Sequence, residues 1–394
     1  MKNWYLPNQK RLLIGVLLLL TLGCIVALWK LASATDLGKG DFIGYWSAVY
    51  ILHEGNNPYD PAGMMEIQQS LIQSGLDFVV MAWNPPTLFA FMLPLAWLSF
   101  VSAKATWLVV NVVILLLVIL MLASLYIPHS SRSFFGFCFL IILFPQVLIA
   151  ITMGQVTFLV LIGLVSGMLL IKNEQWFWAG ATLILTTVKP HMAFLAVPYI
   201  LLYMSCRRKW QGWLGLFSAV AMCLIALTWF RPFWVKDYIG LFAIAPVNWA
   251  TPTLGGILSF LHLTEGMRYL VFLFLPLAWV LARQQTTLSL ETSVALLTVL
   301  TVPITFYGWS YDQSILLIPI AQIFGWLVNL SHNRIRIAIT AVIVVSILIN
   351  WIQRINNTNE VYYLWIPIFW AVIYGGLFVM RNVSTSSKTS SEFA

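Results

Sequence analysis

Apolar positions along this chain form long runs that short polar segments separate. A straight helix needs about 20 apolar residues to cross a bilayer, and several of the runs approach that length. The pattern predicts an all-α, polytopic integral membrane protein in which residues 1–380 form the transmembrane domain. The runs lie near 12–29, 85–100, 105–126, 134–151, 156–171, 178–205, 210–230, 268–282, 291–306, 314–330, 335–352 and 363–380.

Two of these runs have unusual features. The run 12–29 is longer than the ~7 to 15 residues of a signal-peptide core, so it is interpreted as an uncleaved first span, although Ala32-Ser33-Ala34 resembles a cleavage site. The run 178–205 is interrupted at Lys189-Pro190, where proline removes a helix hydrogen bond. Counted as one bent crossing, this run gives about twelve transmembrane helices.

The distribution of basic residues agrees with twelve spans, because that count places twelve of the 21 Lys and Arg residues on one side, as the positive-inside rule requires of the cytoplasmic side. Both termini are then cytoplasmic, and the Ser/Thr-rich tail 381–394 is predicted to be disordered. The outer side holds the segments 30–84, 231–267 and 307–313. The twelve basic residues on the cytoplasmic side are Lys2, Lys10, Arg11, Lys104, Arg207, Arg208, Lys209, Arg283, Arg334, Arg336, Arg381 and Lys388.

Composition excludes a soluble protein. Apolar residues make up 61% of the chain and charged residues only 9%, against roughly 25% charged in soluble domains. The net charge of +8 comes from basic residues that stand singly or in short clusters beside apolar runs, so membrane lipids rather than nucleic acid are the predicted surroundings. The four cysteines have no metal-ligand spacing and form no disulfide framework.

The first outer segment, 30–84, carries six of the 13 acidic residues. Aromatic and aliphatic residues recur at helical spacing from Phe42 to Leu52, which predicts a helix lying in the membrane interface. Gly55 to Pro61 breaks this helix, and Met64 to Ile72 predicts a second one. Two interfacial helices between the first two spans would cover a site on the outer side of the membrane.

Asp41 begins the first of these predicted helices, directly after Gly38-Lys39-Gly40. One interpretation is a helix N-cap, since an Asp there accepts backbone N–H groups. The other is a general base held at the membrane surface over a lipid-facing cavity. The sequence leaves both open.

Six short motifs follow one another along most of 40–320. They are Asp41-Phe42 with Tyr45 and Trp46, Gly55-Asn56-Asn57-Pro58-Tyr59-Asp60, Asn84-Pro85-Pro86, Gly154-Gln155, Lys189-Pro190-His191 and Trp309-Ser310-Tyr311-Asp312. Together they resemble glycosyltransferase family 87, the polyprenol-phosphate-mannose-dependent membrane mannosyltransferases of the C-type (GT-C) superfamily. The resemblance implies a GT-C fold, a polyprenyl-phosphate-linked sugar donor with mannose as the expected sugar, an active site outside the cytoplasm and a first-loop Asp as base, which matches Asp41. The family's last outer motif often has a His near Tyr311-Asp312, from which this chain departs.

The implied chemistry suits these residue types. A sugar phosphate already has a good leaving group, so the enzyme needs a base for the acceptor hydroxyl and positive charge near the departing phosphate. Such a displacement inverts the anomeric centre, unlike the paired-carboxylate retaining scheme. We therefore expect inversion with no metal ion and no cofactor, and a lipid, glycan or other hydroxyl as the acceptor.

Lys189 is a charge within an apolar run, which makes it a candidate for the donor phosphate, although a kinked helix could also let it snorkel. His191, Lys236 and Arg268 are further phosphate candidates, and Arg268 could equally be a membrane anchor. The span count places Gln155 near the cytoplasmic end of its helix pair, so it is interpreted as an interhelical hydrogen-bonding residue, unless the pair is re-entrant. Candidates for sugar or acceptor contacts are Tyr45, Trp46, Tyr59, Asn84, Trp309, Tyr311 and Asp312, the last of which could instead cap the next span.

Two other classes of protein fit the span count. A secondary transporter or lipid flippase would share the intramembrane Lys189, but the sequence has one clear helix break and no internal repeat. A non-catalytic scaffold subunit would bind no lipid phosphate. We expect a glycosyltransferase of cell-envelope glycan biosynthesis in the plasma (inner) membrane of a bacterium.

Overall fold

The computed structural model describes residues 40–72, 77–245, 249–263, 266–284 and 288–391, and the side chains up to residue 381. Every regular element within these ranges is a helix, which confirms the all-α prediction. The predicted first span, 12–29, and the basic N-terminal cluster lie outside the described residues.

Five helical segments of the described chain are long and apolar enough to cross a membrane, and the bent pair α6 (Ser131–Leu143) and α7 (Pro145–Thr152) adds a sixth if it is one span. The chain is therefore a polytopic membrane protein, while the number twelve stays a prediction. The five are α5 (Phe100–Tyr126), α11 (Trp210–Phe230), η5 (Ser310–Leu316) with α16 (Leu317–Val328), α17 (Asn333–Ile355), and η6 (Glu360–Leu364) with the first part of α18 (Trp365–Ser391).

The remaining apolar runs form shorter helices, each too short to cross alone as a straight helix. Two of them, α8 and α15, are largely buried inside the protein. These helices are α4 (Thr87–Met92), η1 (Leu93–Trp97), α8 (Thr157–Lys172), α9 (Trp176–Thr182), η2 (Leu183–Val188), η3 (Pro190–Ala193), α10 (Ala196–Cys206), η4 (Gly266–Phe274), α14 (Leu275–Arg283) and α15 (Leu290–Ile304).

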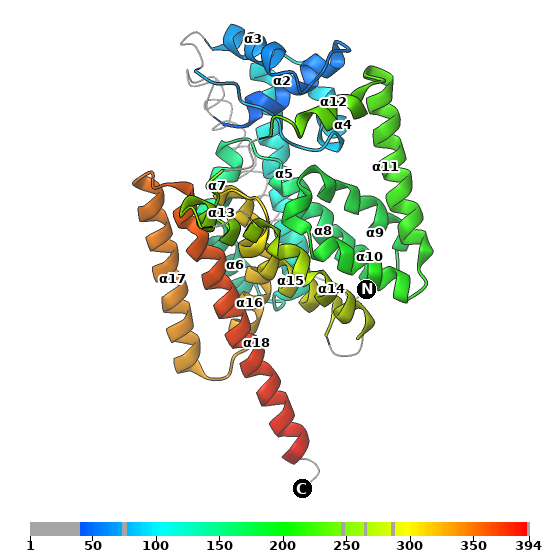
Figure 1. Cartoon of the computed structure of the whole chain (residues 1–394). Helices are drawn as coiled ribbons and strands as arrows, with labels where there is room; N and C mark the ends of the chain where they lie inside the picture. The colour runs from blue at the N-terminus through cyan, green and yellow to red at the C-terminus, as the bar shows by residue number, and fades with distance from the viewer. Residues whose placement is uncertain (1–39, 73–76, 246–248, 264–265, 285–287, 392–394) are drawn as a thin grey trace.

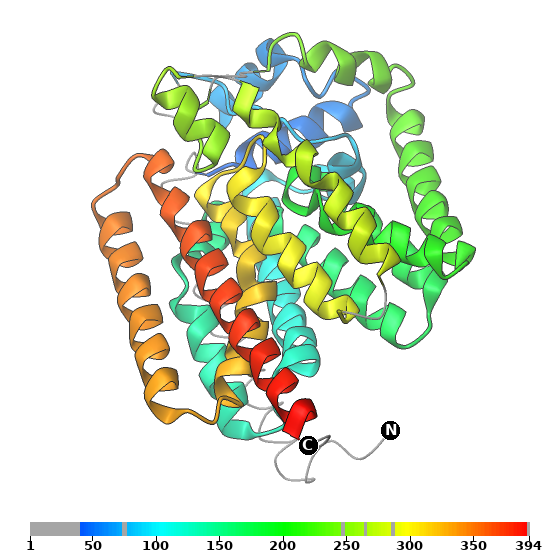
Figure 2. The same cartoon turned by 60° about the horizontal axis from the view of Figure 1, so that its bottom comes forward.

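The helices of the first outer segment lie at one end of the molecule, at the top of Figure 1, together with α12 (Trp234–Leu241). They are α2 (Phe42–His53) and α3 (Pro61–Leu71), close to the predicted positions. α17 and α18 form one flank and α11 the opposite flank in both views (Figures 1 and 2), with α13 (Leu254–Phe260) beside the top of α18 in Figure 1.

Helix α2 is enclosed by protein on nearly every side, with ten of its twelve residues buried. Trp46 donates its indole N–H to Leu95 O at 3.2 Å and packs against Phe100. An interfacial helix would expose one polar face, so the structure differs here from the amphipathic helix that the spacing predicts. Its aromatic content instead builds the core beneath the site.

The run 85–100 does not leave the end of the molecule at which Asp41 lies. It begins at Asn84, whose carbonyl accepts the Tyr59 hydroxyl at 2.9 Å, and returns to α2 through the bond between Trp46 and Leu95. Trp107, in the second turn of α5, donates to Gly154 O at 2.8 Å, so α5 also starts at this end. The prediction that 85–100 is a complete crossing, with Lys104 on the side opposite Asp41, is therefore wrong.

The run 178–205 breaks at the predicted place, because η2 ends at Val188 and Pro190 opens η3. However, its halves form a hairpin rather than one bent crossing: Lys209, just after α10, lies 5.2 Å from the ring of Trp176 at the start of α9. The run 85–100 removes one predicted crossing and the hairpin adds one, so the number of crossings before Arg207 is unchanged. Arg207 to Lys209 therefore still lie at the end opposite Asp41.

Helix α18 runs on to Ser391, through most of the tail that the polar composition predicts to be disordered. In Figure 1 its end projects beyond the other helices. An existing helix can propagate into a polar segment because only nucleation is costly.

Two tight turns are pressed together beneath the site. Gly154 has φ +66°, and a Cβ on it would lie 2.7 Å from Cβ of Phe42, while Gly40 has φ +104° and a Cβ there would lie 2.9 Å from Met153 O. Only residues without a side chain fit this contact and these backbone angles without strain. The contact fixes Asp41 against the turn that carries Gln155.

Gly154→Ala is expected to lower the free energy of unfolding by about 2 kcal/mol or more, from left-handed backbone strain and overpacking. Thermal unfolding in detergent measures the change. Gly376→Ala, in α18 with nothing within 4 Å of its added Cβ, is the matched control and should unfold like the wild type. An equal shift for both variants would show that the turn contact contributes nothing.

Candidate active site

Asp41 occupies the N-cap position of α2, but its side chain caps nothing. Its carboxylate instead accepts hydrogen bonds from the Tyr311 hydroxyl at 2.8 Å and from the Gln155 amide. The backbone N–H of Asp41 donates to Met153 O at 3.0 Å, which anchors the residue. The local interpretation of Asp41 as a cap therefore does not explain its side chain, and the carboxylate is partly exposed.

Gln155 is completely buried in the turn between α7 and α8, and its side chain contacts three candidate residues. Its Oε1 accepts from Lys189 Nζ at 2.8 Å and from the Tyr45 hydroxyl at 3.0 Å, while its Nε2 donates to Asp41. The predicted span count places Gln155 at the end opposite Asp41. This is wrong, because that count treats the run 85–100 as a crossing. The re-entrant alternative had allowed this outcome.

Lys189 and Asp312 form a buried ion pair, with 2.7 Å between Nζ and Oδ1. Asp312 also accepts from Thr157 at 3.1 Å and from the Trp309 backbone N–H at 3.0 Å, and its Oδ2 lies 3.5 Å from Nε2 of His191. Both oxygens of Asp312 are therefore engaged. The Trp309 contact is the capping role foreseen for Asp312, but the ion pair is an additional one.

Aromatic rings form a continuous wall beside these charges. The ring of Trp309 lies 5.6 Å from Trp249 and 6.4 Å from Tyr311, and Lys189 Nζ lies 4.7 Å over the ring of Tyr311. Tyr307 contacts both Trp249 and His191. Burial raises the pKa of the Tyr307 hydroxyl, and the negative charge of Asp312 raises it further, so this phenol stays protonated.

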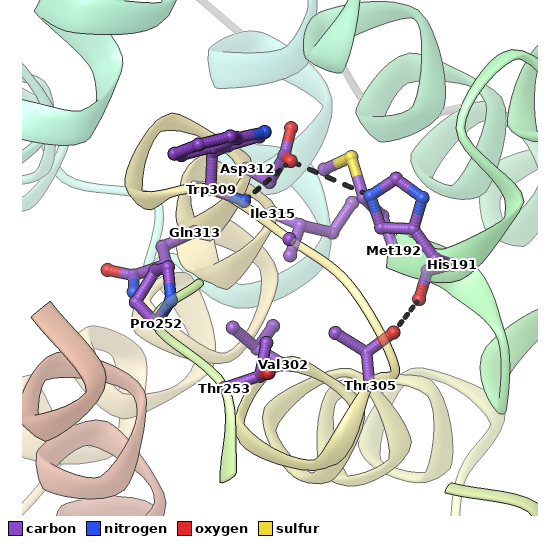
Figure 3. A pocket seen from close by; sticks show the side chains of 11 residues that line it. His191, Met192, Pro252, Thr253, Val302, Thr305, Trp309, Asp312, Gln313 and Ile315 are labelled. Atoms are coloured by element: carbon purple, nitrogen blue, oxygen red, sulfur yellow. Dashed lines mark hydrogen bonds and ion pairs between the residues drawn. The ribbon is translucent and has the colours of Figure 1, made fainter. Parts of the chain in front are cut away.

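A small hollow adjoins Asp312 on the side of His191, as Figure 3 shows. Its space between atoms is about 260 Å³, but this includes open solvent, and the enclosed part is far smaller than the roughly 300 Å³ of a ligand pocket. In this conformation it accommodates part of a lipid-linked sugar at most. The lining residues are His191, Met192, Pro252, Thr253, Val302, Thr305, Gly308, Trp309, Asp312, Gln313 and Ile315.

The comparison with known families gives one finding. The model of Glycosyltransferase family 87 matches residues 83–306, more than half of the chain. The chain belongs to glycosyltransferase family 87. No curated protein and no solved structure matches it.

Membership confirms the resemblance seen in the sequence and makes the protein a membrane glycosyltransferase. The matched segment contains Gln155, Lys189 and His191. It begins after Asp41 and ends before Trp309. The fold of this family 87 chain thus brings residues from both sides of the matched segment onto residues within it.

The other predicted residues lie around this cluster or away from it. Asn84 donates its amide to Val188 O at 2.9 Å, just before Lys189, and Arg268 donates to Trp249 O at 2.9 Å behind the aromatic wall. Tyr59 packs against Phe89 and Tyr238, and Trp46 packs within the core. Lys236 is exposed on α12. Their binding roles stay predictions.

Arg354, at the end of α17, contacts the start of η5 beside this cluster, although sequence reasoning did not select it. It pairs with Glu360 at 2.9 Å and donates to the Ser310 hydroxyl, while Glu360 accepts the Ser310 backbone N–H at 3.0 Å. These bonds hold the start of η5, which carries Tyr311 and Asp312. The only signal in the sequence was a pair of opposite charges six residues apart, which is uninformative by itself.

Arg354→Met is expected to lower sugar transfer about tenfold, because η5, which carries Tyr311 and Asp312, loses an anchor and holds Tyr311 less firmly against Asp41. Transfer rates and thermal unfolding of the purified protein measure this. Arg336→Met removes a half-buried guanidinium that bonds Asn333 on the same helix, and should change neither quantity. A wild-type transfer rate in Arg354→Met would contradict an anchoring role.

Proposed function

We propose that this enzyme transfers a sugar, with mannose as the expected one, from a polyprenyl-phosphate donor to an acceptor hydroxyl with inversion, using Asp41 as the general base. The observation that carries this proposal is the unequal use of the two clustered carboxylates. Asp312 is buried and engaged on both oxygens, whereas Asp41 is partly exposed and, among the residues that the structure describes, receives two neutral donors. Neutral donors orient a carboxylate without giving it a counter-charge, so it can still accept a proton.

The reaction follows from this arrangement. Asp41 would accept the proton of the acceptor hydroxyl as its oxygen attacks the anomeric carbon, and the bond from that carbon to the phosphate oxygen would break. Retaining enzymes place a second carboxylate about 5–5.5 Å from the first, free to act as nucleophile. Because Asp312 is held in an ion pair, a single available carboxylate supports inversion.

The donor phosphate would lie near Lys189 and His191, whose side chains project from the break between η2 and η3. Positive charge there stabilises the leaving phosphate. Tyr45, Trp309, Tyr311 and the other predicted aromatic residues would contact sugar or acceptor, because flat rings pack against sugar faces. The reaction is proposed to need neither a metal ion nor a cofactor.

The site is proposed to face the extracytoplasmic side of a bacterial plasma membrane, with both termini in the cytoplasm. Supporting this, Arg207 to Lys209 and Lys172 lie at the end of the molecule opposite Asp41: Lys209 contacts Trp176 and Lys172 pairs with Glu291 at 3.2 Å, each one helix length from the site. The positive-inside rule assigns such an end to the cytoplasm. Twelve spans, counting 12–29 and both legs of the hairpin, fit this orientation.

The test is transfer by the purified protein from polyprenyl-phosphate mannose, with polyprenyl-phosphate glucose and nucleotide sugars as alternative donors. Transfer with inverted configuration, read by NMR of the product, is expected, and chelator should not slow it. Transfer from a nucleotide sugar alone would overturn the donor class, and retained configuration would overturn the mechanism. A transporter or flippase would instead move the lipid across liposomes without a glycosylated product.

A further inference from the structure

The side chain of Gln155 is oriented by its surroundings. Its Nε2 meets the Asp41 carboxylate, and its Oε1 meets the Lys189 ammonium at 2.8 Å and the Tyr45 hydroxyl at 3.0 Å. The flipped amide would set its N–H₂ against an ammonium and its oxygen against a carboxylate. Only one orientation satisfies all of these contacts.

The backbone of the same turn is immobilised from several helices. Gln155 O accepts the Asn111 amide at 3.0 Å, Gln155 N donates to Ala150 O at 2.8 Å, and Gly154 O accepts the Trp107 indole at 2.8 Å. The residue is fully buried. A side chain fixed in this way can set the position of a neighbour to within a fraction of an ångström.

We infer that Gln155 is a positioning residue that fixes the Asp41 carboxylate and keeps it bridged to Lys189 through a neutral amide rather than paired with it directly. This inference rests on the proposed function and assigns a role that the sequence did not. A direct ion pair with Lys189 would give the Asp41 carboxylate a counter-charge and weaken it as a base. The amide bridge keeps Asp41 out of such a pair, while Lys189 pairs with Asp312.

The charged groups around Asp41 determine how a substitution at Gln155 should change the pH at which Asp41 is protonated. Gln155→Glu replaces the N–H donor with an oxygen, so two carboxyl groups would face each other, and like charges at this distance keep one proton bound to higher pH. The positive charge of Lys189 offsets this effect only in part, because Lys189 is also paired with Asp312. The ionisable groups that face the cluster are Tyr45 on α2, Lys189 and His191 at the helix break, Tyr307 before η5, and Tyr311 and Asp312 on η5.

Labelling of Asp41 by dicyclohexylcarbodiimide, which attacks protonated carboxyl groups, tests this without any assumption about substrate. Peptide mass spectrometry reads Asp41 separately from residue 155 as pH is varied. In Gln155→Glu the labelling midpoint is expected to move to higher pH by about one unit or more. An unchanged midpoint would overturn the inference.

Gln146 provides the matched control, because it is equally buried, lies in α7, the helix that precedes the turn of Gln155, and accepts from Asn350 at 2.9 Å instead of contacting the cluster. Gln146→Glu should leave the Asp41 midpoint unchanged. A shift of the same size in both variants would show a general effect of added charge and would also overturn the inference.

A second pair covers the case in which the charged variant fails to fold. Gln155→Met keeps the volume and removes both hydrogen-bonding atoms, and should lower kcat about 100-fold with unfolding comparable to that of Gln146→Met. Similar kcat values in these two variants would count against a positioning role. If the wild type transferred no sugar, the proposed function would fail, whereas the labelling result would still decide the role of Gln155.

Discussion

Asp41→Asn is expected to lower kcat by about a thousandfold or more, because an amide cannot accept the proton of the acceptor hydroxyl. The variant keeps nearly the same volume and can still accept the Tyr311 hydroxyl, so the fold should be retained. Transfer from a polyprenyl-phosphate sugar measures the effect, with binding of the labelled donor measured separately. Donor binding should change little, since the base acts on the acceptor.

Asp60→Asn is the control for this change. Asp60 lies in the same outer segment, and its side chain caps α3 by accepting the N–H groups of Ala62 and Gly63, both at 3.2 Å. Asparagine caps helices about as well as aspartate, so this variant should transfer sugar normally. Activity within about tenfold of wild type in Asp41→Asn would remove Asp41 from the mechanism.

Lys189→Met is expected to have the second largest effect, on both stability and transfer. Removing one partner of a buried ion pair costs about 3–5 kcal/mol, because the Asp312 carboxylate keeps its charge without a counter-ion. The same change removes positive charge from the proposed phosphate site. Thermal unfolding in detergent and the KM for the donor measure the two consequences.

Lys172→Met separates this effect from the loss of an ordinary ion pair. Lys172 is more than half exposed and pairs with Glu291 at 3.2 Å, far from the site. Exposed pairs contribute about 1 kcal/mol or less, so unfolding and transfer should stay near wild type. Equal losses of stability in the two lysine variants would argue against a special role for the pair of Lys189 and Asp312.

Much of the fold could be predicted from the hydrophobic runs and from the proline and glycine residues that end helices. Each described apolar run coincides with helical structure, and Pro190 and Gly55 mark the two breaks where the structure has them. These features are local, since proline and glycine act on their own backbone and a run of apolar residues is helical in either lipid or protein.

Sequence reasoning failed where a short apolar run can either cross a membrane or be buried within the protein. The runs 85–100 and 178–205 have the same hydrophobicity in both cases, and their misassignment placed Gln155 at the end opposite Asp41. It also could not select Arg354 or Trp249, because their roles arise from contacts with residues far away in the chain.

The sequence by itself determined that this is a helical membrane protein of glycosyltransferase family 87 and marked Asp41, Lys189 and Asp312 as candidates. Only the tertiary structure decided that Lys189 pairs with Asp312, that Asp41 accepts hydrogen bonds from the neutral Tyr311 and Gln155 side chains, and that the amide of Gln155 joins the two sides. The reason is physical: residue types fix which contacts are possible, but the energy of a buried charge depends on which partners the packing of distant helices brings within hydrogen-bonding distance.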